Sequence, residues 1–503
     1  MISNILLGIE GICTIPNMAA IFLGVVVGVA VGALPGFTTG MGVAVLLPVT
    51  FSMTPLAGLA LLGAIYVGAM YGGAILAIMV NTPGTPAAAA TVLDGYSMTK
   101  KGQAGEALIE ASVSSFWGTI LGALALLFLA PPLAAVSLKF GPPEMFMLAM
   151  FGLTIVVSLT ANSILKGAIS CIIGLLIGAV GMDPLIAFPR YTFGESNLLA
   201  GVAFVPALIG LFSASQVFAL IQEGGDNILE IDTKVVKDVK PTLKDMIMYP
   251  KVYLRSGIIG IIVGVAPAAG ASIAAFIGYN EGKKWSKTPE EFGKGCREGV
   301  AAAETANSAS VGGSLVPTLT LGIPGNSVTA ILMGGLMIHG LRTGHTLFSE
   351  HAHIVYPFII SLFVASFMML FIGLYGSKYF AAIAKTPINV LIVMVFVFGG
   401  LGAYAVTNNI FDIYVMFVFG IVGYLLRIAK FDLAPIVLGM ILGPIAERGL
   451  NQTMVIARGK AVIPFMFSRP ICIVLLIISI VSVLTPILRS DMVKGFFKKT
   501  QQN

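Results

Sequence analysis

The stretches "NTPGTP" at residues 81–86 and "GIPGNS" at residues 322–327 decide how this sequence folds. Each follows a long apolar run and places a Pro-Gly pair beside small polar residues, where an uninterrupted membrane helix would continue. Backbone N–H and C=O groups cannot stay unpaired in hydrocarbon, so helices broken there must lie inside protein or beside a water-filled cavity. One Pro-Gly pair could equally be a packing kink. Two at matching positions favour a binding site.

The composition around these breaks is that of a polytopic membrane protein. Hydrophobic residues make up 57% of the 503 residues and charged residues only 10%, against about 25% charged residues in soluble domains. Apolar windows long enough to cross a bilayer of about 30 Å recur, and we expect roughly 10 to 12 transmembrane helices. The clearest windows are residues 19–34, 56–80, 118–136, 169–182, 354–376, 388–406, 413–426 and 471–488.

Other classes of protein and site find little support in the sequence. The four cysteines form no CxxC or Cys/His cluster, and we expect a solvated loop, not a metal site, around the four histidines between residues 339 and 353. HExxH, GxSxG and Walker A sequences do not occur, so we expect neither an enzyme nor a nucleotide-driven pump. The net charge of +6 is spread over short loops, which predicts no nucleic-acid partner. We expect no cofactor other than a coupling ion.

Sequence motifs repeat on the two sides of a polar stretch. We expect a first membrane repeat at residues 1–222, a polar connector at 223–250, and a second membrane repeat with C-terminal helices at 251–503. "VGALPGFTTG" (31–40) matches "VGVAPAAGAS" (263–272), "FSMTP" matches "WSKTP", and the two Pro-Gly breaks follow in the same order. Equivalent prolines are offset by 267 − 35 = 232, 289 − 55 = 234 and 324 − 83 = 241 residues. Ordered matches whose offset drifts in one direction indicate an internal repeat.

The charges of equivalent loops predict that the repeats are inverted. The loop around "FSMTP" is neutral, but its counterpart at residues 281–298 is highly charged and net basic. After the Pro-Gly breaks the bias reverses, with two lysines in residues 97–103 and one arginine in residues 338–346. Because basic loops face the cytoplasm, equivalent loops are expected on opposite sides of the membrane. The same rule predicts a cytoplasmic C-terminus from "KGFFKKTQQN" (494–503).

Broken helices at matched repeat positions predict a central substrate site near mid-membrane. Helix N-termini at the breaks would supply free N–H groups and a positive dipole end to an anion. We expect the Pro-Gly breaks to form this site jointly, with Gly84 and Gly325 leaving room for the ligand beside the backbone. The expected binding residues of these two breaks are Asn81, Thr82, Gly84, Thr85, Gly325, Asn326 and Ser327.

A second pair of breaks, "LPGFTTG" and "APAAGAS", carries hydroxyl groups beside Gly and Pro. Hydroxyls in helices often hydrogen-bond to the preceding turn. Next to the repeat breaks we expect them to contact substrate or ion. The residues expected to take part are Gly36, Thr38, Thr39, Ala271 and Ser272.

Glu304 is the best candidate for a coupling-ion ligand, because ionisable residues inside apolar sequence are functional candidates by default. It stands in "VAAAETANSASVGG" (300–313), where Asn307 and Ser308 could complete a site for a proton or Na⁺. The alternative is that Glu304 caps the charged loop that ends near Glu298. The first repeat has Gly and Ala at the equivalent place, so no symmetric acid supports the ion role. Asp94, in "TVLDGYSM", is expected to end a helix and shape a turn with Gly95.

Four stretches of the chain resemble the large membrane subunit of the tripartite tricarboxylate transporters. They are "GALPGFTTGMGVAVLLPVTF", "NTPGTPAAAATVLDGYSMTKKGQAGEAL", "AETANSASVGGSLVPTLTLGIPGNSVTAILMGGLMIHGLRTG" and "LAPIVLGMILGPIAERGLNQTMVIARG". Together they extend the resemblance over nearly the whole chain. Two details depart from the family pattern: "DGYSM" stands where "DGYPM" is often seen, and "GIPGNS" has no Asn before its Ile-Pro-Gly.

The resemblance implies a bacterial inner-membrane importer of carboxylates such as citrate, coupled to a Na⁺ or H⁺ gradient. It implies an all-α, elevator-type fold with inverted repeats and re-entrant hairpins. It also implies two partners, a small membrane subunit of about four helices and a periplasmic solute-binding protein. An uncoupled channel or permease for small organic anions is the alternative, followed by a membrane enzyme or a structural scaffold. The sequence leaves open which carboxylate and which ion are carried.

The inverted topology can be tested by cysteine labelling from each side of the membrane. The variants Lys100→Cys and Lys284→Cys should be labelled only from the cytoplasm, and Ser52→Cys and Arg342→Cys only from outside, because their loops differ in charge bias. Labelling of positions 52 and 284 from the same side would show that the repeats are parallel.

Overall fold

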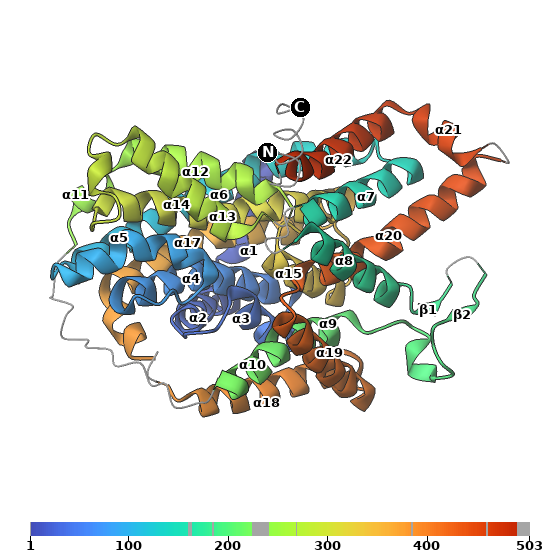
Figure 1. The fold of residues 1–503 in the computed structure, drawn as a ribbon, viewed down its shortest axis with the longest axis horizontal. Helices are drawn as coiled ribbons and strands as arrows, with labels where there is room; N and C mark the ends of the chain where they lie inside the picture. Colours follow the sequence, from blue (N-terminus) through green and yellow to red (C-terminus); the bar gives the residue numbers. More distant parts are fainter. Residues whose placement is uncertain are drawn as a thin grey trace, which may run out of the picture. The chain divides into compact units, whose positions relative to one another are not determined.

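The computed structural model describes residues 2–158, 163–183, 186–223, 241–267, 269–383, 386–458 and 461–489, and these residues are almost entirely helical (Figure 1). The only strands among them are β1 (Gly181–Met182) and β2 (Pro189–Arg190), which form a short antiparallel pair. The basic C-terminal stretch and most of the polar connector lie outside the described residues.

The chain forms two compact units, and each combines segments from both halves of the sequence. Unit 1 comprises residues 1–135 and 205–424, and unit 2 comprises residues 136–204 and 425–503. The first part of unit 1 contains α1 (Ile2–Ile12), α2 (Ile15–Gly32), α3 (Thr39–Leu46), η1 (Leu47–Ser52), α4 (Pro55–Val80), η2 (Pro86–Ala88), α5 (Ala89–Lys100) and α6 (Ala104–Ser137).

The second part of unit 1 begins with a continuous helical segment, α9 (Phe204–Leu208), the π-helical turn η4 (Ile209–Ala214) and α10 (Ser215–Glu223). It continues with α11 (Leu243–Met246), α12 (Pro250–Val265), α13 (Gly270–Trp285), η6 (Pro289–Glu291), α14 (Arg297–Leu321), α15 (Ser327–Ile338), α16 (His345–Ser349), α17 (Ala352–Ile383), α18 (Ile388–Thr407) and α19 (Ile410–Ile428).

Unit 2 is built from α7 (Pro142–Ser158), α8 (Ile164–Gly178), η3 (Ser196–Leu198), α20 (Ala434–Ile456), α21 (Val462–Phe467) and α22 (Pro470–Arg489), with the β1–β2 pair between α8 and η3. Helix α20 packs against both α7 and α8, and α22 packs against α7. Arg469, at the start of α22, makes an ion pair with the buried carboxylate of Glu144 on α7 (3.0 Å).

Seven helices of the described residues are long and apolar enough to cross a membrane. They are residues 15–32, 55–80, 104–137, 204–222, 352–383, 389–407 and 410–428. Most of the predicted apolar windows fall within helices, but the window at 169–182 does not end as expected. Helix α8 stops at Gly178, and the chain then turns into strand β1.

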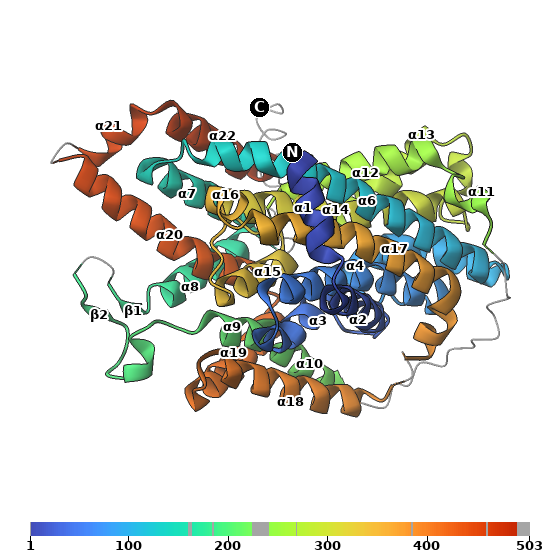
Figure 2. The same cartoon turned by 180° about the vertical axis from the view of Figure 1, so that it is seen from behind.

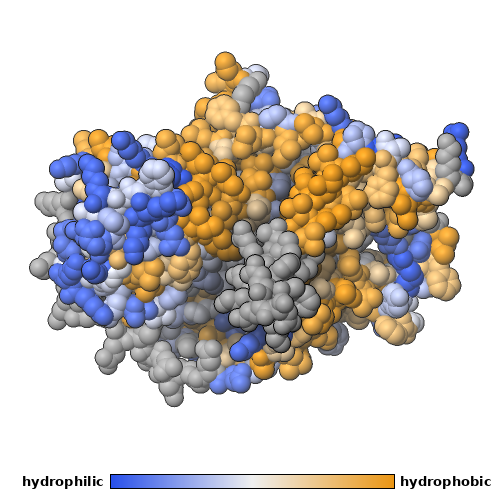
Figure 3. All heavy atoms as spheres, turned by 45° about the horizontal axis from the view of Figure 1, so that its top comes forward, coloured by the Kyte–Doolittle hydropathy of each residue, from blue (hydrophilic) through white to orange (hydrophobic). Residues whose placement is uncertain are grey.

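The surface of the molecule carries broad hydrophobic areas (Figure 3). Large apolar side chains are exposed on the candidate spans, among them Phe371 on α17, Leu401 on α18 and Val418 on α19. Exposed apolar surface of this extent marks contact with a membrane or with other proteins. Helix α1 lies against α17, one of these spans (Figure 2).

Helices α4 and α14 form the buried centre of unit 1. The apolar sequence of α4 shows no polar face, as expected of a helix surrounded by protein, and its most apolar 18 residues are all buried. In α14, residues 299–320 are buried as well, although this helix is rich in small polar residues. Polar groups buried in a membrane protein need a function or a partner.

Glycines let the helices beside these two central helices approach closely. A Cβ on Gly28 of α2 would lie 2.4 Å from the backbone oxygen of Ile65 on α4. A Cβ on Gly260 of α12 would lie 2.3 Å from the backbone oxygen of Ala306 on α14. Both contacts leave no room for a side chain, and this is how small residues bring membrane helices together.

The α2–α4 contact predicts a large difference between two helical glycines. Gly28→Ala should lower stability by about 1–3 kcal/mol, because the added methyl group meets backbone that cannot move aside. Gly400→Ala on α18 is the matched control: its Cβ would meet nothing within 4 Å, so its effect should be neutral or slightly stabilising. Thermal unfolding of both purified variants in detergent measures this, and equal melting temperatures would contradict the packing interpretation.

Candidate substrate and ion site

Both Pro-Gly breaks begin with a residue in the left-handed conformation. Helix α4 ends at Asn81 (φ 61°), and α14 ends at Gly322 (φ 69°). Their offset, 322 − 81 = 241, equals that of the two prolines inside the breaks. A left-handed residue is a common way to end a helix, because it turns the chain off the helix axis. The two breaks therefore begin with the same local geometry.

After this turn, each break folds back onto the helix that precedes it. The Gly84 amide donates to the Gly73 backbone oxygen (3.2 Å), and the Gly325 amide donates to Thr318 Oγ1 (3.3 Å). A Cβ on Gly84 would lie 2.1 Å from the Gly32 oxygen, and one on Gly325 would lie 2.7 Å from Ser314 Cβ. The expectation that these glycines leave room for a ligand is therefore wrong, since protein already fills that space.

The remaining residues of the breaks differ in exposure. Asn81 and Gly36 are exposed, whereas Thr39, Thr85 and Ala271 are buried. The half-buried residues are Thr38, Thr82, Ser272, Asn326 and Ser327. Thr85 has a buried hydroxyl with no hydrogen-bond partner among the described residues.

Two side chains of the breaks cap the helices that follow them. Thr38 precedes α3, and its hydroxyl accepts a hydrogen bond from the Met41 amide (3.2 Å). Asn326 precedes α15; its Oδ1 accepts from the Thr329 amide (3.0 Å), and its Nδ2 donates to the Tyr66 hydroxyl on α4 (2.7 Å). Capping by such side chains satisfies helix N–H groups that would otherwise lack partners. Asn326 thus links the second break to α4 of the first half.

The second Pro-Gly break lies beside the shorter break of the first half. A Cβ on Gly40 would lie 3.8 Å from Thr38 Oγ1 and 3.7 Å from Ser327 Oγ, so the starts of α3 and α15 meet. The first Pro-Gly break also contacts the other half, since η2 packs against α13, the helix that follows the second shorter break.

The two Pro-Gly breaks contact α4 at different positions along the helix axis. Asn326 bonds to Tyr66, whereas Thr85 lies against Gly73. The contact positions differ by 73 − 66 = 7 residues, or about 10 Å along a helix.

Glu304 is fully buried in α14 (0% exposed) and receives hydrogen bonds from three side chains. The Thr91 hydroxyl on α5 donates to Oε1; the Ser115 hydroxyl on α6 (3.1 Å) and Asn307 Nδ2 (3.4 Å) donate to Oε2. No basic side chain among the described residues pairs with this carboxylate. This burial excludes the alternative that Glu304 caps the charged loop.

Unpaired oxygen atoms accompany Glu304 along α14. Within the described part of the chain, Asn307 Oδ1, Ser308 Oγ and Thr305 Oγ1 are buried and have no hydrogen-bond partner. Oxygen atoms of carboxylates, amides and hydroxyls are the groups that bind small hard cations. A carboxylate without a counter-ion is costly to bury unless it takes up a proton or a cation. The arrangement can therefore bind a proton or a small cation.

Sequence reasoning identified Glu304 and its hydrogen-bonded neighbour Asn307 but missed the two hydroxyl donors on other helices. Glu304, Asn307 and Ser308 share one helical face, since they are three and four residues apart. Thr91 and Ser115 come from α5 and α6, and nothing in their local sequence indicates that they reach α14. Only the packing of these helices brings their hydroxyls to Glu304.

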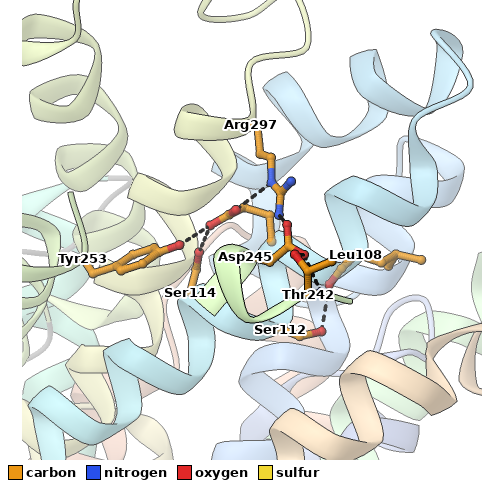
Figure 4. A network of polar contacts seen from close by, with 8 residues as sticks. Leu108, Ser112, Ser114, Thr242, Asp245, Tyr253 and Arg297 are labelled. Carbon is orange, nitrogen blue, oxygen red and sulfur yellow. Dashed lines mark hydrogen bonds and ion pairs between the residues drawn. The ribbon is translucent and has the colours of Figure 1, made fainter. Parts of the chain in front are cut away.

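A second buried carboxylate, Glu110 on α6, lies in a network that joins four helices (Figure 4). Arg297, at the start of α14, donates to Glu110 Oε2 and to Asp245 Oδ1 on α11, each at 2.7 Å. Tyr253 on α12 and Ser114 both donate to Glu110 Oε1 at 2.9 Å. Glu110 therefore has a cationic partner, Arg297, whereas the donors to Glu304 are all neutral.

The network also fixes the end of the polar connector. Partial burial would raise the pKa of Asp245, but hydrogen bonds from Thr242 and Arg297 outweigh it and lower this pKa. Trp117 on α6 donates to the Met246 backbone oxygen (2.7 Å) and holds the same short helix. Glu110 could have been found from the sequence, because it is an acidic residue inside an apolar run.

The fold and the buried polar site define a class, a polytopic helical membrane protein with broken helices and a buried carboxylate held by neutral donors. Residues 18–438 match the family described as the tripartite tricarboxylate transporter TctA family, and the chain belongs to this family. It is therefore the large membrane subunit of a tripartite tricarboxylate transporter and not an enzyme.

Two relatives come from Agrobacterium vitis. One, described as an uncharacterized 52.8 kDa protein in the TAR-I ttuC' 3' region, is 37% identical over 502 residues, or 99% of each chain. The other, described as an uncharacterized protein in the TAR-II ttuC' 3' region, is 34% identical over 231 residues, which are 46% of this chain and 95% of the relative. No solved structure matches the chain.

The network around Glu110 predicts a strong dependence of stability on Arg297. Arg297→Ala should lower stability by about 3–5 kcal/mol, because it leaves the buried Glu110 carboxylate without its cation. Lys284→Ala is the control: its ion pair with Glu281 is exposed and long (3.5 Å), so its loss should cost less than about 1 kcal/mol. Thermal unfolding in detergent compares the two, and similar losses would show that the Glu110–Arg297 pair contributes little.

Proposed function

We propose that this chain is the permease subunit of a binding-protein-dependent secondary transporter that imports carboxylates, either tricarboxylates such as citrate or related di- and monocarboxylates. Uptake is driven by a Na⁺ or H⁺ gradient across the bacterial inner membrane. A small membrane subunit and a periplasmic solute-binding protein complete the system. The observation that carries the coupling is the buried Glu304 carboxylate, which has hydroxyl and amide donors but no cationic partner in the described part of the chain. A channel that needs no coupling ion would have no use for such a group.

Matched features of the two halves support an inverted repeat. The glycines that bring α2 onto α4 and α12 onto α14 are offset by 260 − 28 = 232 residues, as are the prolines of the shorter breaks. The packing of the breaks is also reciprocal, because η2 contacts α13 and α15 contacts α3. Two such halves inserted in opposite directions would enclose a site from both sides of the membrane. Movement of this core against a fixed part of the protein would then carry the site across, as in an elevator.

The substrate is proposed to bind where the breaks of the two halves meet. The starts of α3 and α15 lie together and carry Thr38, Asn326 and Ser327. Their dipoles place partial positive charge at the same point, which favours a carboxylate. On the other side, the unpaired Thr85 hydroxyl lies in the break that contacts α13. A substrate with several carboxylates could use both groups of donors at once.

Reconstituted transport tests this proposal directly. Uptake of radiolabelled citrate and shorter carboxylates into proteoliposomes is measured with both partner subunits, under a Na⁺ gradient, an H⁺ gradient or neither. We expect accumulation only when one of the gradients is present. Equal flux without any gradient would favour the uncoupled permease.

The same assay predicts a specific effect of Glu304. Glu304→Gln keeps the size of the side chain but removes the negative charge, so gradient-driven uptake should fall about tenfold or more. Glu106→Gln on the same unit is the control, since Glu106 is a half-buried acid at the start of α6 outside the cluster, and its uptake should match the parent. Unchanged ion dependence in Glu304→Gln would remove this residue from the coupling mechanism.

A further inference from the structure

Asp94 lies in the middle of α5 and is fully buried (0% exposed). The expectation that it ends a helix is therefore wrong, since α5 continues to Lys100. Its Oδ1 accepts hydrogen bonds from three backbone amides, those of Gly293 (2.9 Å), Gly295 (2.8 Å) and Cys296 (2.8 Å). Its Oδ2 accepts a hydrogen bond from the Tyr279 hydroxyl on α13 (2.8 Å). The side chain thus reaches across to the loop that precedes α14.

Residues 293–296, here named the carboxylate socket, have a backbone shaped to surround an anion. Gly293 (φ 84°) and Gly295 (φ 93°) adopt conformations that other residues rarely take. Backbone amides that converge in this way form an anion-binding concavity. Gly299 keeps the approach open, because a Cβ there would lie 2.1 Å from Asp94 Oδ2. The chain fills its own socket with the Asp94 carboxylate.

The same helix face carries the hydroxyl that contacts Glu304. Thr91 lies three residues before Asp94, so the two side chains share one face of α5. Thr91 donates to the Glu304 carboxylate, while Asp94 occupies the socket immediately before α14 begins at Arg297. Helix α5 is therefore attached at two points, to the loop immediately before α14 and to Glu304 within α14. One of these points is the proposed ion ligand itself.

We propose that Asp94 is a positioning residue for the coupling ion. Seated in the carboxylate socket, it holds α5 at the height and rotation at which the Thr91 hydroxyl meets Glu304, and so tunes how tightly Glu304 binds its ion. This inference rests on the coupling role proposed for Glu304. The simpler alternative is that Asp94 only ties the α13–α14 loop in place and has no effect on ion binding.

The socket itself can be tested by chemical rescue. Asp94→Ala leaves three amides and one phenol without an acceptor, and the melting temperature of the purified protein should fall. Sodium formate should restore much of the loss, because formate is a carboxylate small enough for the vacated space. Sodium chloride at the same ionic strength should not restore it. No difference between the two salts would overturn the assignment of residues 293–296 as a carboxylate socket.

The positioning role is tested by the ion dependence of carboxylate uptake in proteoliposomes. Asp94→Ala and Thr91→Val should each raise the half-saturating concentration of the coupling ion about tenfold, the effect of losing one hydrogen bond to a charged group. The double variant should show no more than the Thr91→Val effect, because Asp94 acts through Thr91. Asp94→Asn, which keeps the oxygen facing the three amides, should stay within about threefold of the parent.

The outcomes separate this inference from the proposed function. If Glu304→Gln changes ion dependence but Asp94→Ala does not, Asp94 is only structural and the inference fails. If Glu304→Gln itself keeps the parental ion dependence, the coupling role fails first. Additive effects of Asp94→Ala and Thr91→Val would also overturn the inference. Should Asp94→Ala not fold by itself, it is measured in sodium formate, which fills the socket but cannot hold α5 in place. Parental ion dependence under that condition would overturn the inference.

Discussion

The rest of this structure depends on the rule that backbone polar groups must be paired inside a membrane. Two helices of unit 1 are interrupted by Pro-Gly breaks, and the chain buries the glycine of each Pro-Gly pair, although Asn81 at the start of the first break stays exposed. Each break bonds to its own helix, through Gly84 in one half and Gly325 in the other. Neighbouring helices then close over α4 and α14, the two most buried helices of the unit. A broken helix thus requires other helices packed around it, and this packing also buries polar side chains such as Glu304.

Two acidic residues among these packed helices show how different environments suit different roles. Glu110 has a cation, a phenol and a hydroxyl as partners, so its charge is balanced and the ion pair serves to join helices. Glu304 has only neutral donors, with unpaired oxygens beside it. A buried charge whose counter-ion is built in is stable in one state. A buried charge without one can bind a mobile ion and so suits a transporter of the TctA family.

Glycine has three separate roles in this chain, although the sequence shows only a glycine in each case. In α2 and α12 it lets helices touch. In Gly84 and Gly325 it lets a break return to its own helix. In Gly293 and Gly295 it allows the backbone to curve around a carboxylate. Sequence patterns identify such positions but do not distinguish close packing from ligand access. The contacts that an added Cβ would make do distinguish them, because they show whether protein already occupies the space beside the glycine.

The sequence predicted roughly 10 to 12 transmembrane helices, whereas seven helices of the described residues are long and apolar enough to cross a membrane. It did determine the membrane class of the chain, the positions of both Pro-Gly breaks, and the presence of an acidic residue, Glu304, inside an apolar run. These follow from apolar length, from the effect of proline and glycine on helices, and from the cost of charge in hydrocarbon, all of which act locally. Only the tertiary structure decided that Thr91 and Ser115 meet Glu304, that the Asp94 side chain fills a socket about 200 residues away in the sequence, and that the second Pro-Gly break lies beside the shorter break of the first half. Contacts between distant segments depend on how whole helices pack, and the local hydrophobic pattern of a segment does not predict which helices it packs against.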